Sequence, residues 1–157
     1  MTRLPIYAAA VVAAIAAAAC GGYSSPSTTY APSGTGTSTS STIGSATSNL
    51  GRILVDGNGD TLYLFEADKG TMSSCYGSCA QVWPPVTGTP LAGSGTPGAE
   101  LATTQRQDGT TQILYNGHPL YRYAGDAKAG DTTGQGLNQF GGKWYVLAPS
   151  GNKIDNG

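Results

Sequence analysis

Apolar and polar residues alternate over two short segments in the middle of the chain. RILVD at 52–56 and TLYLF at 61–65 are rich in β-forming residues, and the turn-forming residues GNGD at 57–60 separate them. Alternation with a period of two is typical of strands, and a short glycine-containing break between two such runs is typical of a hairpin. The pattern therefore predicts a β-hairpin over these residues.

The same pattern returns further along the chain. TQILYN at 111–116 is strand-like, Asn116-Gly117 is a strong turn signal, and PLYRY at 119–123 predicts the partner strand. Before it, LATTQRQDGTTQILY at 101–115 carries an Asp-Gly turn between two β-prone runs, and after it KWYVLA at 143–148 predicts the last strand. Long amphipathic segments are absent from the sequence, and only 78–82 permits a helix of one or two turns.

These elements predict an all-β fold, a small compact domain of short antiparallel strands with one short helical turn near a cysteine pair. The two halves match in order: strand, glycine turn, strand ending in aromatic residues, aspartate, tryptophan. A unit present twice indicates two pseudo-symmetric repeats that share one core. The predicted bounds are 49–150 for the domain, about 50–88 for repeat 1, about 100–149 for repeat 2 and 151–157 for a flexible tail.

The first nineteen residues predict a signal peptide. Arg3 supplies the positive charge, IYAAAVVAAIAAA is an apolar run, and small residues precede Cys20. The run is too short and too rich in alanine for a spanning helix, which needs roughly 20 strongly apolar residues. AAACG resembles a bacterial lipobox, in which the signal is cut before a cysteine whose thiol is then diacylated. A plain secretory signal with an A-x-A cleavage site is the alternative.

Residues 20–48 combine the lipidated Cys20 with a stretch dominated by Ser, Thr, Gly and Pro. Its apolar residues lack periodicity, so it buries too little surface to offset its ordering entropy. We therefore predict a disordered stalk between the anchor and the domain.

Charge and composition exclude several classes of protein. The net charge is −1 in 157 residues, without a basic stripe, so we expect no nucleic-acid partner. One histidine and three cysteines are a poor inventory for acid–base or hydrolytic zinc chemistry. Sequence motifs of nucleophile elbows, P-loops, Rossmann folds and zinc proteases are absent. We therefore expect no enzymatic activity, no cofactor and no catalytic residues.

The two halves share the motif Y-x-[FWY]-x-x-D, as YLFEAD at 63–68 and as YRYAGD at 121–126. With the lipobox, the cysteine-containing loop and Trp-Pro-Pro at 83–85, this motif closely resembles a family of bacterial lipoproteins described as a secreted repeat of unknown function. The resemblance covers about 50–149 and both copies. It implies a secreted, usually lipid-anchored protein of the cell envelope. The second copy lacks the cysteine pair and the paired prolines, so any role of those belongs to the first.

The motif side chains have two interpretations. Residues two apart in a strand share a face. The two aromatic side chains of each motif are therefore expected on one face of the strand, and the residues before and between them on the other. In the structural interpretation, which we favour, each aspartate accepts backbone N–H bonds, holds its own turn and reaches back to a tyrosine hydroxyl. In the functional interpretation, both copies line one pocket that binds a cation or a polar ligand. The residues concerned are Tyr63, Phe65, Asp68, Tyr121, Tyr123 and Asp126.

Cys75 and Cys79 are expected to form a disulfide, because the protein is exported and the spacing of four is geometrically allowed. The alternative is a copper-binding or thiol-redox protein, since C-x-x-x-C with a histidine resembles the copper site of envelope copper-delivery proteins. That site would comprise Cys75, Cys79, His118 and Met72. The fold of those copper proteins is α/β, whereas no segment here predicts a βαβ unit.

Trp83 and Trp144, one in each copy, are expected to fill the core. Exposed aromatic residues would instead stack on the sugar rings of a cell-wall glycan. The sequence thus favours an exported lipoprotein, lipid-anchored to the membrane on its extracytoplasmic side. We expect a non-enzymatic binding or structural module whose partner is a cell-wall glycan or another envelope protein.

Overall fold

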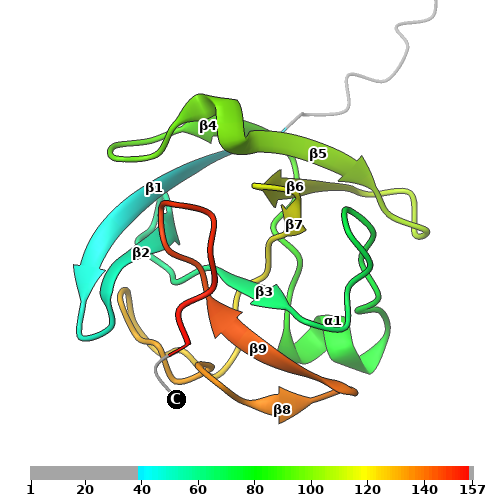
Figure 1. Cartoon of the computed structure of the whole chain (residues 1–157). Coiled ribbons are helices and arrows are strands. Elements are labelled where there is room, and N and C mark those ends of the chain that lie inside the picture. The colour runs from blue at the N-terminus through cyan, green and yellow to red at the C-terminus, as the bar shows by residue number, and fades with distance from the viewer. Residues whose placement is uncertain (1–38, 156–157) are drawn as a thin grey trace, which may run out of the picture. The chain divides into compact units, whose positions relative to one another are not determined.

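The structure is a computed structural model that describes residues 39–155. Nine short strands, one α-helix and one 3-10 turn make up this part of the chain (Figure 1). Their bounds are β1 Ser40–Ser48, β2 Gly51–Asp56, β3 Tyr63–Phe65, α1 Ser78–Val82, β4 Thr89–Ala92, η1 Gly98–Glu100, β5 Leu101–Gln105, β6 Thr111–Tyr115, β7 His118–Pro119, β8 Asn138–Gln139 and β9 Gly142–Val146. The all-β prediction with one short helix at 78–82 is confirmed.

The strands form three sheets of three, in the orders β2-β1-β4, β3-β9-β8 and β5-β6-β7. All pairs are antiparallel except β1 with β4, which is parallel. Isolated bridges join the sheets; Tyr121, for example, pairs with both Tyr63 and Pro85. The domain is therefore held together by contacts between segments that are distant in the sequence.

Local turn chemistry forms two of the three predicted hairpins, β5–β6 and β6–β7. The hairpin predicted over 52–65 is wrong, because β2 pairs with β1 and β3 pairs with β9, and only a single bridge between Val55 and Thr61 joins the two segments. Asn116 and Gly117 have φ of 47° and 78°, which the tight turn between β6 and β7 requires and which asparagine and glycine tolerate best. Asp108 accepts bonds from the backbone N–H and hydroxyl of Thr110 at the β5–β6 turn. His118 begins β7 directly after the β6–β7 turn and is half-buried.

The buried side chains form two apolar clusters, which lie on opposite faces of the segments that carry the two motifs. The reason is that alternate side chains of a strand point to opposite faces. Leu62, Leu64 and Leu120 belong to an aliphatic cluster. The tyrosines of both motifs belong to a second cluster, which holds most of the aromatic rings. In the second copy Arg122 takes the place of a leucine. It is half-buried and its Nε donates to the buried Asp56 carboxylate at 2.6 Å.

The prediction of a disordered stalk is wrong for its last nine residues, Ser40–Ser48, because they form β1. Backbone hydrogen bonding explains the error, since β1 pairs with β2 along most of its length and with β4 over Ser40–Ile43. Ile43 is fully buried in the aliphatic cluster. One buried side chain among small polar residues leaves no alternation that a sequence pattern would reveal.

The prediction of a flexible tail is also wrong for residues 151–155. The backbone N–H of Ile154 donates to the carbonyl of Val146 at 2.8 Å, and the Ile154 side chain packs against the aromatic cluster. Lys153 forms an ion pair of 2.7 Å with Glu66. The domain therefore extends from β1 to this segment, beyond the predicted bounds of 49–150.

None of the helices in the described part of the chain has the length and apolar character needed to cross a membrane. The predicted signal peptide, the lipidated Cys20 and the stalk before residue 39 lie outside the described residues.

Candidate functional site

Each motif aspartate holds the turn that follows its own strand. One carboxylate oxygen of Asp68 accepts bonds from the N–H and the hydroxyl of Ser74, at 2.7 and 2.9 Å. The same oxygen of Asp126 accepts from the N–H and the hydroxyl of Thr133, at 2.9 and 2.6 Å. This part of the structural interpretation is confirmed, and the two turns are built alike.

The second carboxylate oxygen of each aspartate bonds to the other repeat. The Tyr63 hydroxyl donates to Asp126 at 2.7 Å, and the Tyr121 hydroxyl donates to Asp68 at 2.9 Å. The prediction that each motif holds only its own half is therefore wrong. Burial explains the exchange: the two phenols are fully buried and need a hydrogen-bond partner, and the fold places the carboxylate of the opposite copy within reach.

The backbone pairs in the same reciprocal way. The N–H of Tyr63 donates to the carbonyl of Tyr121 at 2.9 Å, and the N–H of Tyr121 donates to the carbonyl of Tyr63 at 3.0 Å. Two residues that exchange both bonds form one rung of an antiparallel ladder. The two motifs are thus related by a local pseudo-two-fold axis that passes between these tyrosines.

Four aromatic rings form a stack across this axis, in the order Phe65, Trp144, Trp83, Tyr123. The ring centroids of the two tryptophans are 3.9 Å apart with an interplanar angle of 5°. Phe65 lies 4.0 Å from Trp144, and Tyr123 lies 4.3 Å from Trp83. Each ring contributed by one repeat therefore packs on a ring from the other.

The motif tyrosines flank the stack edge-on. The ring centroids of Tyr63 and Trp83 are 5.3 Å apart, and those of Tyr121 and Trp144 are 5.1 Å apart, both in T-shaped geometry. Gly134 completes the packing, because a Cβ atom at this position would lie 2.8 Å from Trp83 and 2.9 Å from Tyr63. A glycine is needed here for close approach.

Burial changes the acid–base properties of these groups. Desolvation, followed by the bond to Asp126, raises the pKa of the Tyr63 phenol well above its ordinary value. Desolvation and the charge of Asp68 raise the pKa of Tyr121 in the same way. Desolvation also raises the pKa of the Asp68 carboxyl, although the bonds from Ser74 and Tyr121 oppose the shift. In the folded domain both phenols are therefore held in their neutral form.

A buried arginine adjoins the Asp68 side of this network. The Arg106 side chain is 1% exposed. Its guanidinium donates to the Ser73 hydroxyl, the Gln112 amide oxygen and the Cys75 carbonyl, each at 2.8 Å. The Ser73 hydroxyl in turn lies 2.7 Å from the Tyr121 hydroxyl. Sequence reasoning missed this residue, because an arginine two positions before an Asp-Gly turn has the appearance of an ordinary loop residue.

Cys75 and Cys79 form a disulfide beside α1, and both are buried. The thiolates that the copper alternative requires are therefore oxidised. Met72 is 62% exposed. The described part of the chain holds no cluster of three or more His, Cys, Asp or Glu side chains that would bind a metal ion.

The two tryptophans are fully buried, as predicted, so they cannot stack on a glycan. Of the large apolar side chains described, only Met72, Leu91 and Phe140 are exposed. The stack itself covers the faces of Trp83 and Trp144, so a glycan contact would have to use other residues.

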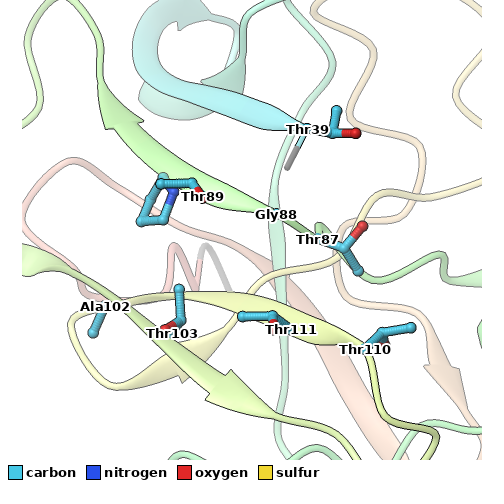
Figure 2. Close-up of a pocket in the computed structure, with 9 residues that line it drawn as sticks. Thr39, Thr87, Gly88, Thr89, Ala102, Thr103, Thr110 and Thr111 are labelled. Carbon is cyan, nitrogen blue, oxygen red and sulfur yellow. The ribbon is translucent and has the colours of Figure 1, made fainter. Parts of the chain in front are cut away.

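A hollow of about 640 Å³ lies elsewhere, between β4 and the β5–β6 hairpin. Figure 2 shows Thr87, Gly88 and Thr89 on one side of it and Thr103 and Thr111 on the other. We call it the threonine groove; its lining is Thr39, Thr87, Gly88, Thr89, Pro90, Ala102, Thr103, Thr110 and Thr111. No lining side chain is charged. The sequence contained no periodic signal for this groove, because its residues come from four separate segments.

Four threonine hydroxyls of the groove have no hydrogen-bond partner among residues 39–155: those of Thr39, Thr87, Thr89 and Thr103. The other two, Thr110 and Thr111, bond to the side chains of Asp108 and Gln105. Each free hydroxyl offers one donor and two acceptor positions. The groove is therefore equipped to hydrogen-bond an uncharged ligand.

The fold and these paired motifs define a class: a β domain made of two interlocked copies of one unit. The family model described as a secreted repeat of unknown function matches the chain twice, over residues 44–87 and 102–148. The chain belongs to this family, and it is a secreted protein with two repeats. No curated protein and no solved structure matches it. The family match begins inside β1, in agreement with the start of the fold.

Proposed function

We propose that this protein is a lipid-anchored envelope module that binds an uncharged, hydroxyl-rich ligand, a cell-wall glycan, in the threonine groove. The observation that carries the proposal is the lining of this groove, which offers four unpaired hydroxyls and no charged side chain. Threonine hydroxyls pair with sugar hydroxyls, and the threonine methyl groups with Pro90 and Ala102 offer apolar contacts to sugar C–H groups.

The internal bonding of the motif supports binding over catalysis. A general base or nucleophile must be free to reach a substrate. Here each motif carboxylate already accepts from a turn and from a phenol, and each motif phenol already donates to a carboxylate. The disulfide occupies both domain cysteines. These groups serve the fold, whereas the open threonine groove carries neutral hydroxyls.

The double substitution Thr89→Val and Thr103→Val tests the groove. Valine keeps the shape and removes the hydroxyl. We expect affinity for isolated cell-wall glycan to fall by about 10-fold, because two hydrogen bonds of about 0.7 kcal/mol each are lost. Co-sedimentation with purified sacculi measures the change. Thr47→Val is the matched control, because Thr47 is an exposed threonine of β1 outside the groove. Equal loss in the control, or no binding by the native protein, would contradict the proposal.

The anchor is tested separately by Cys20→Ser. Cys20 follows a run of small residues after an apolar segment, which supports cleavage before it and lipidation of its thiol. Two or more acyl chains hold a protein at a membrane, since each buried CH₂ contributes about 0.8 kcal/mol. We expect the native protein in the membrane fraction and the variant in the medium. Release of both to the same extent would argue against the anchor and leave the groove unaffected.

A further inference from the structure

The aromatic cluster contains five oxidisable rings in contact with one another: Trp83, Trp144, Tyr63, Tyr121 and Tyr123. The two indoles are stacked at 3.9 Å, and each contacts one motif tyrosine edge-on. Tryptophan and tyrosine are the aromatic side chains that lose an electron most readily. Stacked rings at this distance share their electron density well enough for an electron to pass between them.

Both motif tyrosines carry a built-in proton acceptor. A phenol that loses an electron becomes strongly acidic, so its oxidation is easy only where a base takes the proton. The Tyr63 hydroxyl donates to a carboxylate oxygen of Asp126 at 2.7 Å, and the Tyr121 hydroxyl to one of Asp68 at 2.9 Å. Tyr115 offers the internal comparison: it is equally buried, but its hydroxyl donates to the carbonyl of Pro149, which is no base.

The two ends of the stack differ in a way that sets the direction of electron transfer. Tyr123 is partly exposed and contacts Trp83 at 4.3 Å and Tyr63 at 6.4 Å. The corresponding residue of the first motif is Phe65, which is 4% exposed and is not readily oxidised. Of the two ends of the stack, only the Tyr123 end therefore presents an oxidisable ring to an oxidant in solution.

We propose that this cluster is a one-electron oxidation site, in which an outer-sphere one-electron oxidant at Tyr123 draws an electron from Tyr63 through Trp83. The electron reduces the oxidant. The O–H bond of Tyr63 breaks, its proton moves to the carboxylate of Asp126, and a neutral tyrosyl radical remains. A one-electron reductant at the same end reverses the step, because Asp126 returns the proton. The site acts as a reversible radical trap in a secreted protein, independently of any ligand in the threonine groove.

Flash oxidation of the full mature chain tests the proposal. Photogenerated tris(bipyridine)ruthenium(III) serves as the oxidant, and transient absorption with freeze-quench EPR follows the tyrosyl radical. We expect a radical that forms with a solvent deuterium isotope effect, and we expect its Tyr63 signal to be lost in Tyr63→Phe, which leaves only the signal of Tyr121. In Asp126→Asn the amide oxygen still accepts a hydrogen bond but takes no proton. Radical formation should slow by about 100-fold, the lower end of what a positioned proton acceptor contributes.

Two further variants keep the test independent of folding. Tyr123→Phe removes a hydroxyl without a hydrogen-bond partner among residues 39–155, so the fold is retained, and oxidation of Tyr63 should slow because the outer ring is lost. Tyr115→Phe removes a buried phenol outside the cluster and should leave the radical unchanged. A radical that forms at the native rate in both Tyr123→Phe and Asp126→Asn, or one that Tyr115→Phe abolishes, would overturn the proposal.

Discussion

Alkaline pH is expected to unfold this domain between about pH 10 and pH 12. Tyr63 and Tyr121 are fully buried, and desolvation raises the pKa of each phenol well above the ordinary value of about 10. The folded state therefore keeps both protons at a pH where the unfolded chain releases them. The stability that the neutral phenols contribute is complete below about pH 10 and is lost as the pH rises.

The size of the effect follows from proton linkage. Each buried phenol lowers the free energy of unfolding by about 1.4 kcal/mol per pH unit in this range, so the pair lowers it by about 2.7 kcal/mol per unit. Over two units the loss is about 5 kcal/mol, which is comparable with the whole stability of a small domain. Desolvation raises the pKa of Tyr115 as well, which acts in the same direction.

Urea unfolding at a series of pH values from 8 to 12 measures this slope. Tyr63→Phe removes one of the linked protons and is expected to flatten the curve by about 1.4 kcal/mol per pH unit, even though the variant starts from a lower stability near neutral pH. A slope that is the same in the native protein and in Tyr63→Phe would mean that the phenol titrates alike in the folded and unfolded chain.

Replacement of Trp83 by alanine is expected to cost about 3–5 kcal/mol of stability, enough to leave the domain partly unfolded. Trp83 is fully buried, stacks on Trp144 and Tyr123, and donates its indole N–H to the side chain of Gln139 at 2.9 Å. Alanine would leave a cavity at the centre of the stack, where rings from both repeats meet and the surroundings have little freedom to close it.

Thermal and urea unfolding, followed by near-ultraviolet circular dichroism, measure the loss. Trp144→Ala is expected to behave alike, because the pseudo-two-fold axis gives Trp144 the equivalent place in the stack. Leu91→Ala is the control, since Leu91 is 49% exposed and its replacement should change stability by no more than about 0.5 kcal/mol. A cost for Trp83→Ala as small as that of the control would show that the stack is not central to the core.

The reciprocal bonding bears on how the domain was assembled from two copies of one unit. Neither repeat satisfies its own buried tyrosine, because each phenol donates to the aspartate of the other copy. A single repeat would therefore bury an unpaired phenol and expose one face of its tryptophan. This dependence explains why the two copies of the motif keep both the tyrosine and the aspartate while the residues between them differ.

Local pattern was enough to predict the features that depend on neighbours along the chain. Alternation and turn residues predicted the β5–β6 and β6–β7 hairpins, and the spacing of four predicted the disulfide between Cys75 and Cys79. The aspartates were predicted to hold the turns after their strands, and they do so. Duplication of the motif predicted a pseudo-symmetric pair around one core. In each case the interacting groups lie within a few residues of one another, or the signal is simple repetition.

Which copy each tyrosine and aspartate serves depends on long-range contacts in the folded domain. The partners of Tyr63 and Tyr121 lie 63 and 53 residues away, and the sequence contains an equally suitable aspartate five residues after each tyrosine. The burial of Arg106 and the strand formed by the polar residues Ser40–Ser48 likewise depend on distant segments. The physical reason is common to all three: a buried polar group must be satisfied by whatever the fold brings within hydrogen-bond distance, and local pattern carries no record of that partner.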